Sequence, residues 1–381
     1  MTQPRMVIKL LQAAAWQGNT LDPGQLTDED ISTANQYGLG PLLAWLMRSE
    51  HASLDIMLRK RLASIGAMSR FLTASIANAV VQLAVESGDS RKFMLLKGAS
   101  LITDVYPVPH LRLMGDIDIL VQEKDLAPVC AMLTKLGYEQ YPDLPASFYE
   151  NHHHLMPFRH PNSEVWIEVH SAIFPPGHPC ATLPVFQADY FRRYHQPVMY
   201  QTHAFVRPMA ELNLLYIITH WMLEFRVQDS AGQLLDIIYL MKKYGANFDW
   251  QIFAQMVDNR CTVACVTIVL EYLQGEQLVA IEPRQLTRLR GKKSACGWLG
   301  RRLVCRLIDG IFERRPLVHD YLGLNNVRII WHALLCDRHP LHNYLSLLYK
   351  LLFPPERTDR FSLPFQWSRL RRLFTRSKVQ S

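Results

Sequence analysis

Apolar residues recur at three- and four-residue spacing through most of the first 92 residues. The pattern is clearest over residues 6–16, 42–48 and 63–85, and this spacing is typical of helices that bury one face. Asp28 and Ser32 are suitable helix starts, and Gly88 is a suitable stop. We therefore expect an N-terminal helical region over residues 1–92.

From residue 93 to about 206 the pattern changes to short apolar runs that alternate with helical segments. The predicted elements are a strand over 93–96, a helix over 99–106, a strand carrying Asp116 and Asp118, a helix over 123–136, a strand over 138–141, and a pair of strands over 152–158 and 164–169. The polar turn at 160–163 favours antiparallel pairing of the last two. This order predicts an α+β core with a small mixed sheet.

Helical periodicity returns after a stretch that contains several prolines. Residues 211–226 and 234–244 are strongly apolar on one side, and Gly245 follows as a stop. Further helices are expected to the end of the chain, with breaks at prolines. The chain thus divides into residues 1–92, 93–206 and 207–381, a small sheet core flanked by two helical regions.

Composition narrows the class of protein. The 381 residues are 49% hydrophobic and 20% charged, as in ordinary globular chains that fold as two or three units. The seven cysteines are scattered without a Cys-x-x-Cys pair, which favours reduced thiols in the cytoplasm. No signal-peptide pattern and no run of about 18–20 uncharged apolar residues is found. We expect a soluble, cytoplasmic protein without a transmembrane segment.

The net charge of +7 is concentrated near the C-terminus. Lysines and arginines gather over residues 284–315 and again over 357–378. Such runs attract anionic partners, for example RNA, anionic lipid or an acidic protein. The alternative is that they form ordinary solvated faces of helices.

Asp116 and Asp118 form the most informative pair in the sequence. Positions i and i+2 of a strand share a face, so the two carboxylates point the same way while Ile117 and Ile119 point to the other side. Two like charges side by side in a partly buried strand need a compensating cation, and carboxylate oxygens favour Mg²⁺ or Mn²⁺. A solvated acid pair at a strand end is the alternative.

The segment Lys97-Gly98-Ala99-Ser100 precedes this pair. An apolar run followed by glycine and a helical pattern predicts a strand, a tight turn and a helix, whose first amides can bind an anion. A phosphate-binding turn followed by a divalent-metal pair is typical of a site for a nucleoside triphosphate with Mg²⁺.

The order of these motifs resembles the polymerase-beta-like nucleotidyltransferase superfamily. It is most similar to the bacterial branch called nucleotidyltransferase family 5, in which Lys-Gly is followed by Tyr, Arg and Asp-hydrophobic-Asp. The matching positions are Lys97, Gly98, Tyr106, Arg112, Asp116 and Asp118. The resemblance is specific over residues 93–170 and looser over 208–250. It departs from the superfamily in the Gly-Ala-Ser turn and in a longer segment between Ser100 and Gly115.

The resemblance implies a mechanism and a third carboxylate. An acceptor hydroxyl would attack the α-phosphate of a nucleoside triphosphate and release pyrophosphate, with two Mg²⁺ ions bound by Asp116, Asp118 and Glu168. Glu168 would also accept the acceptor's proton if its pKa is near neutral. Without the metal role, Glu168 would be a cross-strand partner for a basic side chain.

Three further residues are candidates for nucleotide binding. Lys97 could reach phosphate oxygens, and Arg112 could bind the triphosphate or pair with a carboxylate. Ser100 could bind a phosphate or cap the helix.

Histidines offer a second set of candidates. His154 and His170 are expected on the acceptor side of the magnesium site. The run from His152 to His154 also permits a transition-metal site if a further histidine such as His160, His170 or His178 converges on it. The family branch has a His and an Asp in its next two helices, which makes His220 and Asp236 possible substrate-facing residues. His220 could equally be a core histidine.

Three functions are compatible with the sequence. The first is an active, metal-dependent nucleotidyltransferase acting on a small molecule, a protein or an RNA end. The second is a binding or regulatory module that keeps the fold without turnover and acts through the basic helical region. The third is a basic membrane-surface or RNA-associated protein with structural acids. The carboxylates favour the enzyme.

Overall fold

The computed structural model describes residues 5–16, 21–50, 53–88, 92–141, 149–150, 152–163, 165–224, 230–313 and 334–335. The breaks expected at Pro316, Pro340 and Pro354, and the basic segment over 357–378, lie outside these residues.

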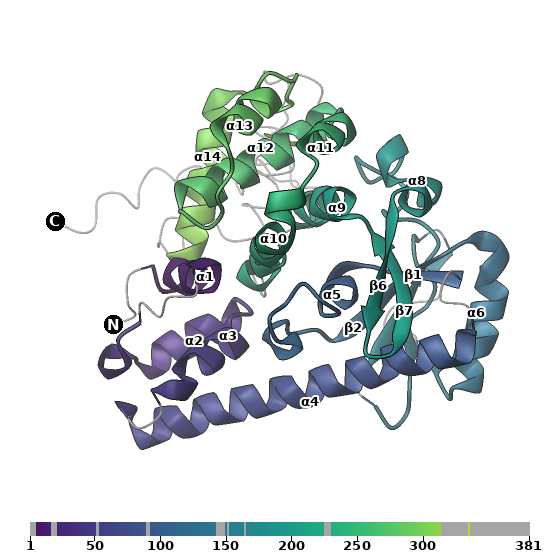
Figure 1. The fold of residues 1–381 in the computed structure, drawn as a ribbon, viewed down its shortest axis with the longest axis horizontal. Helices are drawn as coiled ribbons and strands as arrows, with labels where there is room; N and C mark the ends of the chain where they lie inside the picture. The colour runs from purple at the N-terminus through teal and green to yellow at the C-terminus, as the bar shows by residue number, and fades with distance from the viewer. Residues whose placement is uncertain are drawn as a thin grey trace, which may run out of the picture.

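The N-terminal region is helical, as predicted. Its elements are α1 (Met6–Trp16), η1 (Pro23–Gln25), α2 (Asp28–Gln36), α3 (Gly40–Leu46), η2 (Met47–Ser49) and α4 (Ile56–Ser87). Thr27 and Asp30 cap the start of α2 reciprocally, each side chain accepting a hydrogen bond from the backbone of the other. Gly88 ends α4 in the left-handed region with a φ of 61°. The long α4 runs along one side of the molecule (Figure 1).

Among the described helices, α4 alone is long and apolar enough to cross a membrane by length and composition. No transmembrane segment was predicted from the sequence, because that prediction required an uncharged apolar run. Arg70 interrupts the apolar run of α4. In the structure 39% of its most apolar stretch is buried inside the protein. A core helix of a soluble protein passes the same test, so α4 is weak evidence for a membrane span.

The middle of the chain forms a five-stranded mixed sheet. Its elements are β1 (Phe93–Leu95), α5 (Lys97–Leu101), η5 (Pro109–Leu111), β2 (Asp116–Val121), α6 (Glu123–Lys135), β3 (Glu139–Gln140), β4 (Phe158–Arg159) and β5 (Trp166–His170). The strand order is β1-β2-β5-β4-β3, in which only β2 and β5 are parallel. This sheet with its surrounding helices confirms the predicted α+β fold class.

Two local predictions in this core were wrong, and several elements were missed. The helix predicted over 99–106 is a single turn, α5, and the strand predicted over 152–158 is reduced to β4 plus an isolated bridge between His154 and His170. A hairpin of β6 (His195–Tyr200) and β7 (His203–Pro208) was missed, as were η6 (Pro184–Phe186) and α8 (Ala188–Arg193). Only Val198 is buried in β6, so this strand lacks the apolar alternation that sequence analysis detects.

Alternation along the strands separates the two faces of the sheet. Ile117, Ile119 and Val121 of β2 pack with residues of α4 and α6 in one hydrophobic cluster. Leu120 points to the other face and joins a second, larger cluster with residues of α9 (Ala210–Leu223). Asp116 and Asp118 share the face of Leu120, because they lie an even number of residues from it.

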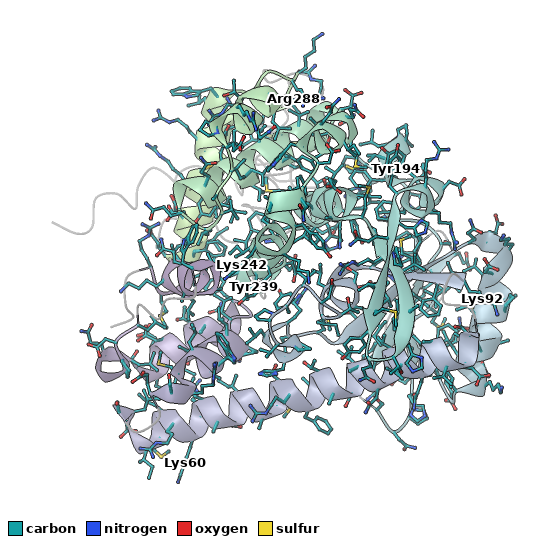
Figure 2. The ribbon with its side chains drawn as sticks, viewed as in Figure 1. Lys60, Lys92, Tyr194, Tyr239, Lys242 and Arg288 are labelled. Carbon is teal, nitrogen blue, oxygen red and sulfur yellow. The ribbon has the colours of Figure 1, made fainter. Side chains whose placement is uncertain are left out.

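The part of the C-terminal region that the structure describes is also helical after β7, as predicted. After α9 come α10 (Ser230–Tyr244), η7 (Gly245–Asn247), α11 (Trp250–Met256), α12 (Arg260–Gly275), α13 (Pro283–Arg290) and α14 (Trp298–Phe312). These helices and α1–α3 contribute to the same large hydrophobic cluster. Lys242 of α10 donates to the carbonyls of Ala14 and Ala15 at the end of α1, at 3.3 and 3.1 Å (Figure 2). The two helical regions therefore share one core, beside the second core under the sheet.

Candidate active site

Three carboxylates lie together on the face of the sheet that carries Leu120. Asp118 and Glu168 are directly paired across the parallel strands β2 and β5, and Asp116 lies two residues before Asp118 on β2. Asp118 is only 3% exposed. Oxygens of Asp118 and Glu168 and a ring nitrogen of His170 all lie within 4.8 Å of one another. The structure thus brings together the three acids singled out in the sequence.

Two basic side chains converge on Asp118. Lys97 Nζ lies 2.7 Å from Oδ1 of Asp118, and Nε2 of His170 lies 2.8 Å from the same oxygen. Burial would raise the pKa of Asp118, but Lys97 and His170 outweigh it and hold this pKa well below its usual range. Burial would likewise lower the pKa of Lys97, and Asp118 raises it instead. Asp118 is therefore ionised. It binds Lys97 and His170 at the acidic centre, the group formed by Asp116, Asp118 and Glu168.

Lys97 also has an unusual backbone. Its φ of 42° lies in the left-handed region, which costs a residue with a side chain about 1–2 kcal/mol. This conformation starts α5 and accompanies the contact between Lys97 Nζ and Asp118. Strain of this kind concentrates at functional sites.

The other two acids have opposite pKa shifts. Burial raises the pKa of Asp116 to about 6, and the charges of Asp118 and Glu168 add to the shift. Burial also acts to raise the pKa of Glu168, but the hydrogen bond from His170 lowers it below its usual value. The near-neutral pKa that was the condition for Glu168 to accept the acceptor's proton is found at Asp116 and not at Glu168.

Gly98 is required by packing. A Cβ at this position would lie 2.2 Å from Sδ and 2.9 Å from Cγ of Met114, a side chain that is itself buried. The helix that follows is one turn long, so it provides little of the dipole expected for anion binding. The structure thus gives Gly98 a close contact with Met114 in place of an open phosphate-binding turn.

Gly98→Ala is expected to lower the free energy of unfolding by about 1–3 kcal/mol, the usual cost of an extra methyl group in a packed interior. Gly115→Ala is the matched control, because a Cβ there has no neighbour within 4 Å. Urea unfolding of both variants measures the difference. Equal effects of the two changes would contradict the packing role.

Ser100 is fully buried, and its hydroxyl makes hydrogen bonds to other groups of the protein. It donates to the carbonyl of Lys97 at 2.7 Å and accepts from Nδ2 of Asn213 at 3.3 Å. The structure therefore favours the local, helix-associated role of Ser100 over a phosphate contact.

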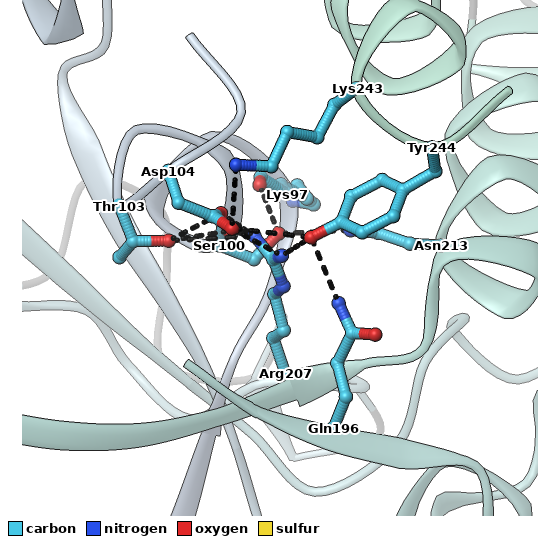
Figure 3. Close-up of polar contacts among 9 residues, drawn as sticks. All are labelled: Lys97, Ser100, Thr103, Asp104, Gln196, Arg207, Asn213, Lys243 and Tyr244. Atoms are coloured by element: carbon cyan, nitrogen blue, oxygen red, sulfur yellow. Dashed lines mark hydrogen bonds and ion pairs between the residues drawn. The ribbon is translucent and has the colours of Figure 1, made fainter. Parts of the chain in front are cut away.

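Arg207 secures the segment after Lys97 (Figure 3). This arginine of β7 is 1% exposed and donates to the carbonyl of Ser100 at 2.8 Å and to both oxygens of Asp104. Tyr244 of α10 donates to Asp104 at 3.2 Å. The hairpin and α10 therefore hold in place the turn that carries Lys97.

Arg112 and Asp236 pair with each other. Nε of Arg112 and the hydroxyl of Tyr106 lie 2.8 and 2.5 Å from Oδ1 of Asp236, which is 3% exposed. Burial raises the pKa of Asp236 and outweighs the effect of Arg112. The contact joins α10 to the segment before β2, so the structure favours a role in positioning Asp116 and Asp118. Asp236 is buried in this contact and does not face solvent.

The predicted histidines lie in different surroundings. Nε2 of His154 lies 3.9 Å from Oε2 of Glu168, and Nε2 of His170 lies 3.4 Å from the same oxygen. His220 contacts the ring of Tyr216 at 5.9 Å between centroids. His154 and His170 therefore border the carboxylates.

Tyr216 of α9 is a candidate that sequence analysis missed. It is fully buried, and its hydroxyl has no hydrogen-bond partner among the described residues. Burial raises its pKa, and the charges of Lys97, Asp118 and Glu168 act on it as well, which locates Tyr216 beside the centre. It lies in an almost wholly apolar helix, four residues before His220. The sequence pattern there predicts a core residue, which is why Tyr216 was missed.

The comparisons with known proteins agree with this geometry. Three carboxylates on one face of a small mixed sheet form the arrangement that the resemblance to nucleotidyltransferases implies. A family model described as an uncharacterised nucleotidyltransferase matches residues 25–272, more than half of the chain. The chain belongs to this nucleotidyltransferase family, which implies a nucleoside triphosphate as substrate. No curated protein and no solved structure matches it significantly.

The residues fit the divalent metal that this family generally uses. The centre offers hard carboxylate oxygens, the donors that Mg²⁺ and Mn²⁺ prefer. Burial, together with the charges of Asp118 and Glu168, raises the pKa of Asp116, and a cation bound there would favour its ionised form. The buried hydroxyl of Tyr216 is a further polar group at the site, and it has no hydrogen-bond partner among the described residues.

Proposed function

We propose that the protein transfers a nucleoside monophosphate from a nucleoside triphosphate to an acceptor hydroxyl and releases pyrophosphate. The observation that carries the proposal is the grouping of Asp116, Asp118 and Glu168 on one face of β2 and β5. Membership in the nucleotidyltransferase family supports the same reaction class. The cytoplasm, where reduced cysteines persist, is the proposed location; the six described cysteines are free.

The three carboxylates are the proposed ligands of Mg²⁺ or Mn²⁺. Two such ions would neutralise charge that develops on the α-phosphate and align the attacking and leaving oxygens. Asp116 is the proposed acceptor of the hydroxyl proton, because its pKa of about 6 is closest to the working pH of the three. Glu168, with its lowered pKa, serves as a ligand.

Lys97 is the proposed contact to the phosphates, because its ammonium group lies at the centre and remains charged. The side chains of Ser100 and Arg112 make contacts inside the protein, so we assign them to positioning. His154 and His170 border the carboxylates and are proposed to face the acceptor. The ring of His220 contacts the ring of Tyr216, and we propose that His220 acts on the substrate by positioning this tyrosine.

The basic C-terminal region is the proposed surface for an anionic acceptor or partner. In the described part, Arg301, Arg302 and Arg306 of α14 line one pocket with Arg290 and the exposed Trp298. Glu271 pairs with Arg290 and Arg301, which leaves a net positive lining. Binding to this surface should weaken steeply with salt.

The reaction is tested with each of the four nucleoside triphosphates labelled at the α-phosphate. The untagged chain is incubated with one of them, Mg²⁺ or Mn²⁺, and cell extract as the source of acceptor. We expect label to enter a single class of acceptor for the preferred base. Equal labelling with and without the protein would overturn the proposal, and the catalytically inactive module would become the better account.

The raised pKa of Asp116 predicts that Mg²⁺ binding depends on pH. Below about pH 6 the metal must displace a proton from this carboxylate, so the apparent affinity should fall up to about tenfold for each pH unit. Titration calorimetry between pH 5 and pH 8 measures this slope. In Asp116→Asn the slope should flatten, and an unchanged slope would assign the proton to another group.

A further inference from the structure

Three consecutive histidines gather beside the acidic centre. In an extended strand, His153 would point away from its two neighbours. Here the ring centroid of His152 lies 4.2 Å from those of both His153 and His154, and the latter two are 5.0 Å apart. One nitrogen from each ring lies within 4.8 Å of the others. The three imidazoles are therefore close enough together for one nitrogen of each to be a ligand of the same ion.

The backbone holds this arrangement against β5. His154 forms a β-bridge with His170, and the carbonyl of His153 accepts hydrogen bonds from Ser171 and Ala172 at 2.9 and 3.1 Å. The amide of Leu155 donates to the carbonyl of Val169 at 2.9 Å. The histidine segment is thus fixed by the end of β5 and has the rigidity that a ligand set needs.

The polar atoms of these rings are arranged for a cation. Nδ1 of His154 lies 2.7 Å from the carbonyl of Leu155, so this nitrogen donates to the carbonyl and Nε2 is the ring nitrogen left to bind a ligand. Nε2 lies 3.9 Å from Oε2 of Glu168, beyond hydrogen-bond distance. Nδ1 of His153 is buried without a hydrogen-bond partner among the described residues. A buried polar atom without a hydrogen-bond partner lowers the stability of the fold.

We propose that His152, His153 and His154 form a second metal site, which binds a transition-metal ion of the Zn²⁺ class. Imidazole nitrogens select such ions, whereas the carboxylates beside them select Mg²⁺ or Mn²⁺. Three histidines leave one position of a tetrahedral ion open. An acceptor hydroxyl or a water can bind at this position, and Oε2 of Glu168, 3.9 Å from Nε2 of His154, lies next to the site. The site stands on the histidine geometry and does not require nucleotidyl transfer to be correct.

The test uses the untagged full chain freed of metal by chelation and kept in excess Mg²⁺, which occupies the acidic centre. Calorimetric titration with Zn²⁺ should give one tight site per chain. Loss of a residue that only supports a ligand costs about 10- to 100-fold in metal affinity. His152→Ala and His153→Ala should therefore each weaken Zn²⁺ binding by at least about 100-fold.

Two control variants should bind Zn²⁺ like the native chain. His195→Ala removes an exposed histidine of β6, and Asp116→Asn removes a carboxylate of the acidic centre. His153→Gln keeps a polar side chain if the alanine variant folds poorly. Thermal unfolding adds a second measurement, because Zn²⁺ should raise the melting temperatures of the native chain and of the two controls but not those of the His152 and His153 variants. Native binding in the His152 and His153 variants, or loss confined to Asp116→Asn, would overturn the proposal.

Discussion

Asp116→Asn is expected to reduce nucleotidyl transfer by about 1,000-fold or more while leaving the protein at least as stable. Metal-assisted charge stabilisation is worth several kcal/mol, and each 1.36 kcal/mol is tenfold in rate. The fold disfavours the charge of Asp116, because burial raises its pKa to about 6 beside Asp118 and Glu168. A neutral amide of the same shape removes that repulsion.

Label transfer and urea unfolding at pH 7.5 measure the two effects of Asp116→Asn. The stability gain should disappear at pH values below about 4, where the native Asp116 is protonated in both the folded and the unfolded chain. Asp258→Asn is the matched control, because that side chain is 90% exposed and lies away from the centre. Full activity in Asp116→Asn would remove this residue from the chemistry.

Asp118→Asn is expected to lower both activity and stability. The activity should again fall by about 1,000-fold or more. In contrast to Asp116, Asp118 is the partner of Lys97 and His170, which would lose a charged neighbour. Removing one partner of a buried pair costs about 3–5 kcal/mol, and the lower end applies because the Lys97 side chain is 25% exposed.

The pH dependence of this stability loss has a definite sign. The pKa of Asp118 is lowered in the folded chain, so its stabilising effect is present above the unfolded pKa of about 4 and is lost as pH falls below it. Unfolding curves of the native chain and Asp118→Asn should therefore differ at pH 7 and approach each other only in strong acid. A variant more stable than the native chain at pH 7 would contradict the anchoring role of Asp118.

Strong local periodicity made part of this protein predictable. The alternation in β2 located Asp116 and Asp118 on one face. The resemblance to the nucleotidyltransferase superfamily implied a third carboxylate, and the alternating pattern of β5 made Glu168 the residue that fits it. Helical spacing predicted α1 at its observed bounds and the body of α4. These patterns involve residues that are close in sequence, so they can be recognised from the amino-acid sequence alone.

Other features depend on contacts between distant segments. Asp236 lies on α10, and nothing local to it indicates a bond to Arg112 and Tyr106. The parallel register of β2 and β5 brings His170 to Asp118, and this register is a property of the assembled sheet. Tyr216 was missed because nearly every residue of its helix is buried, so the sequence pattern does not single out the side that faces the carboxylates.

The most direct measurement compares two positions of the label on the preferred nucleoside triphosphate. With native protein, Mg²⁺ and acceptor, label at the α-phosphate should become attached to the acceptor, and label at the γ-phosphate should leave as pyrophosphate. Asp116→Asn should give neither product. Transfer of the γ-label to the acceptor, or α-label transfer that survives in Asp116→Asn, would contradict nucleotidyl transfer at this centre.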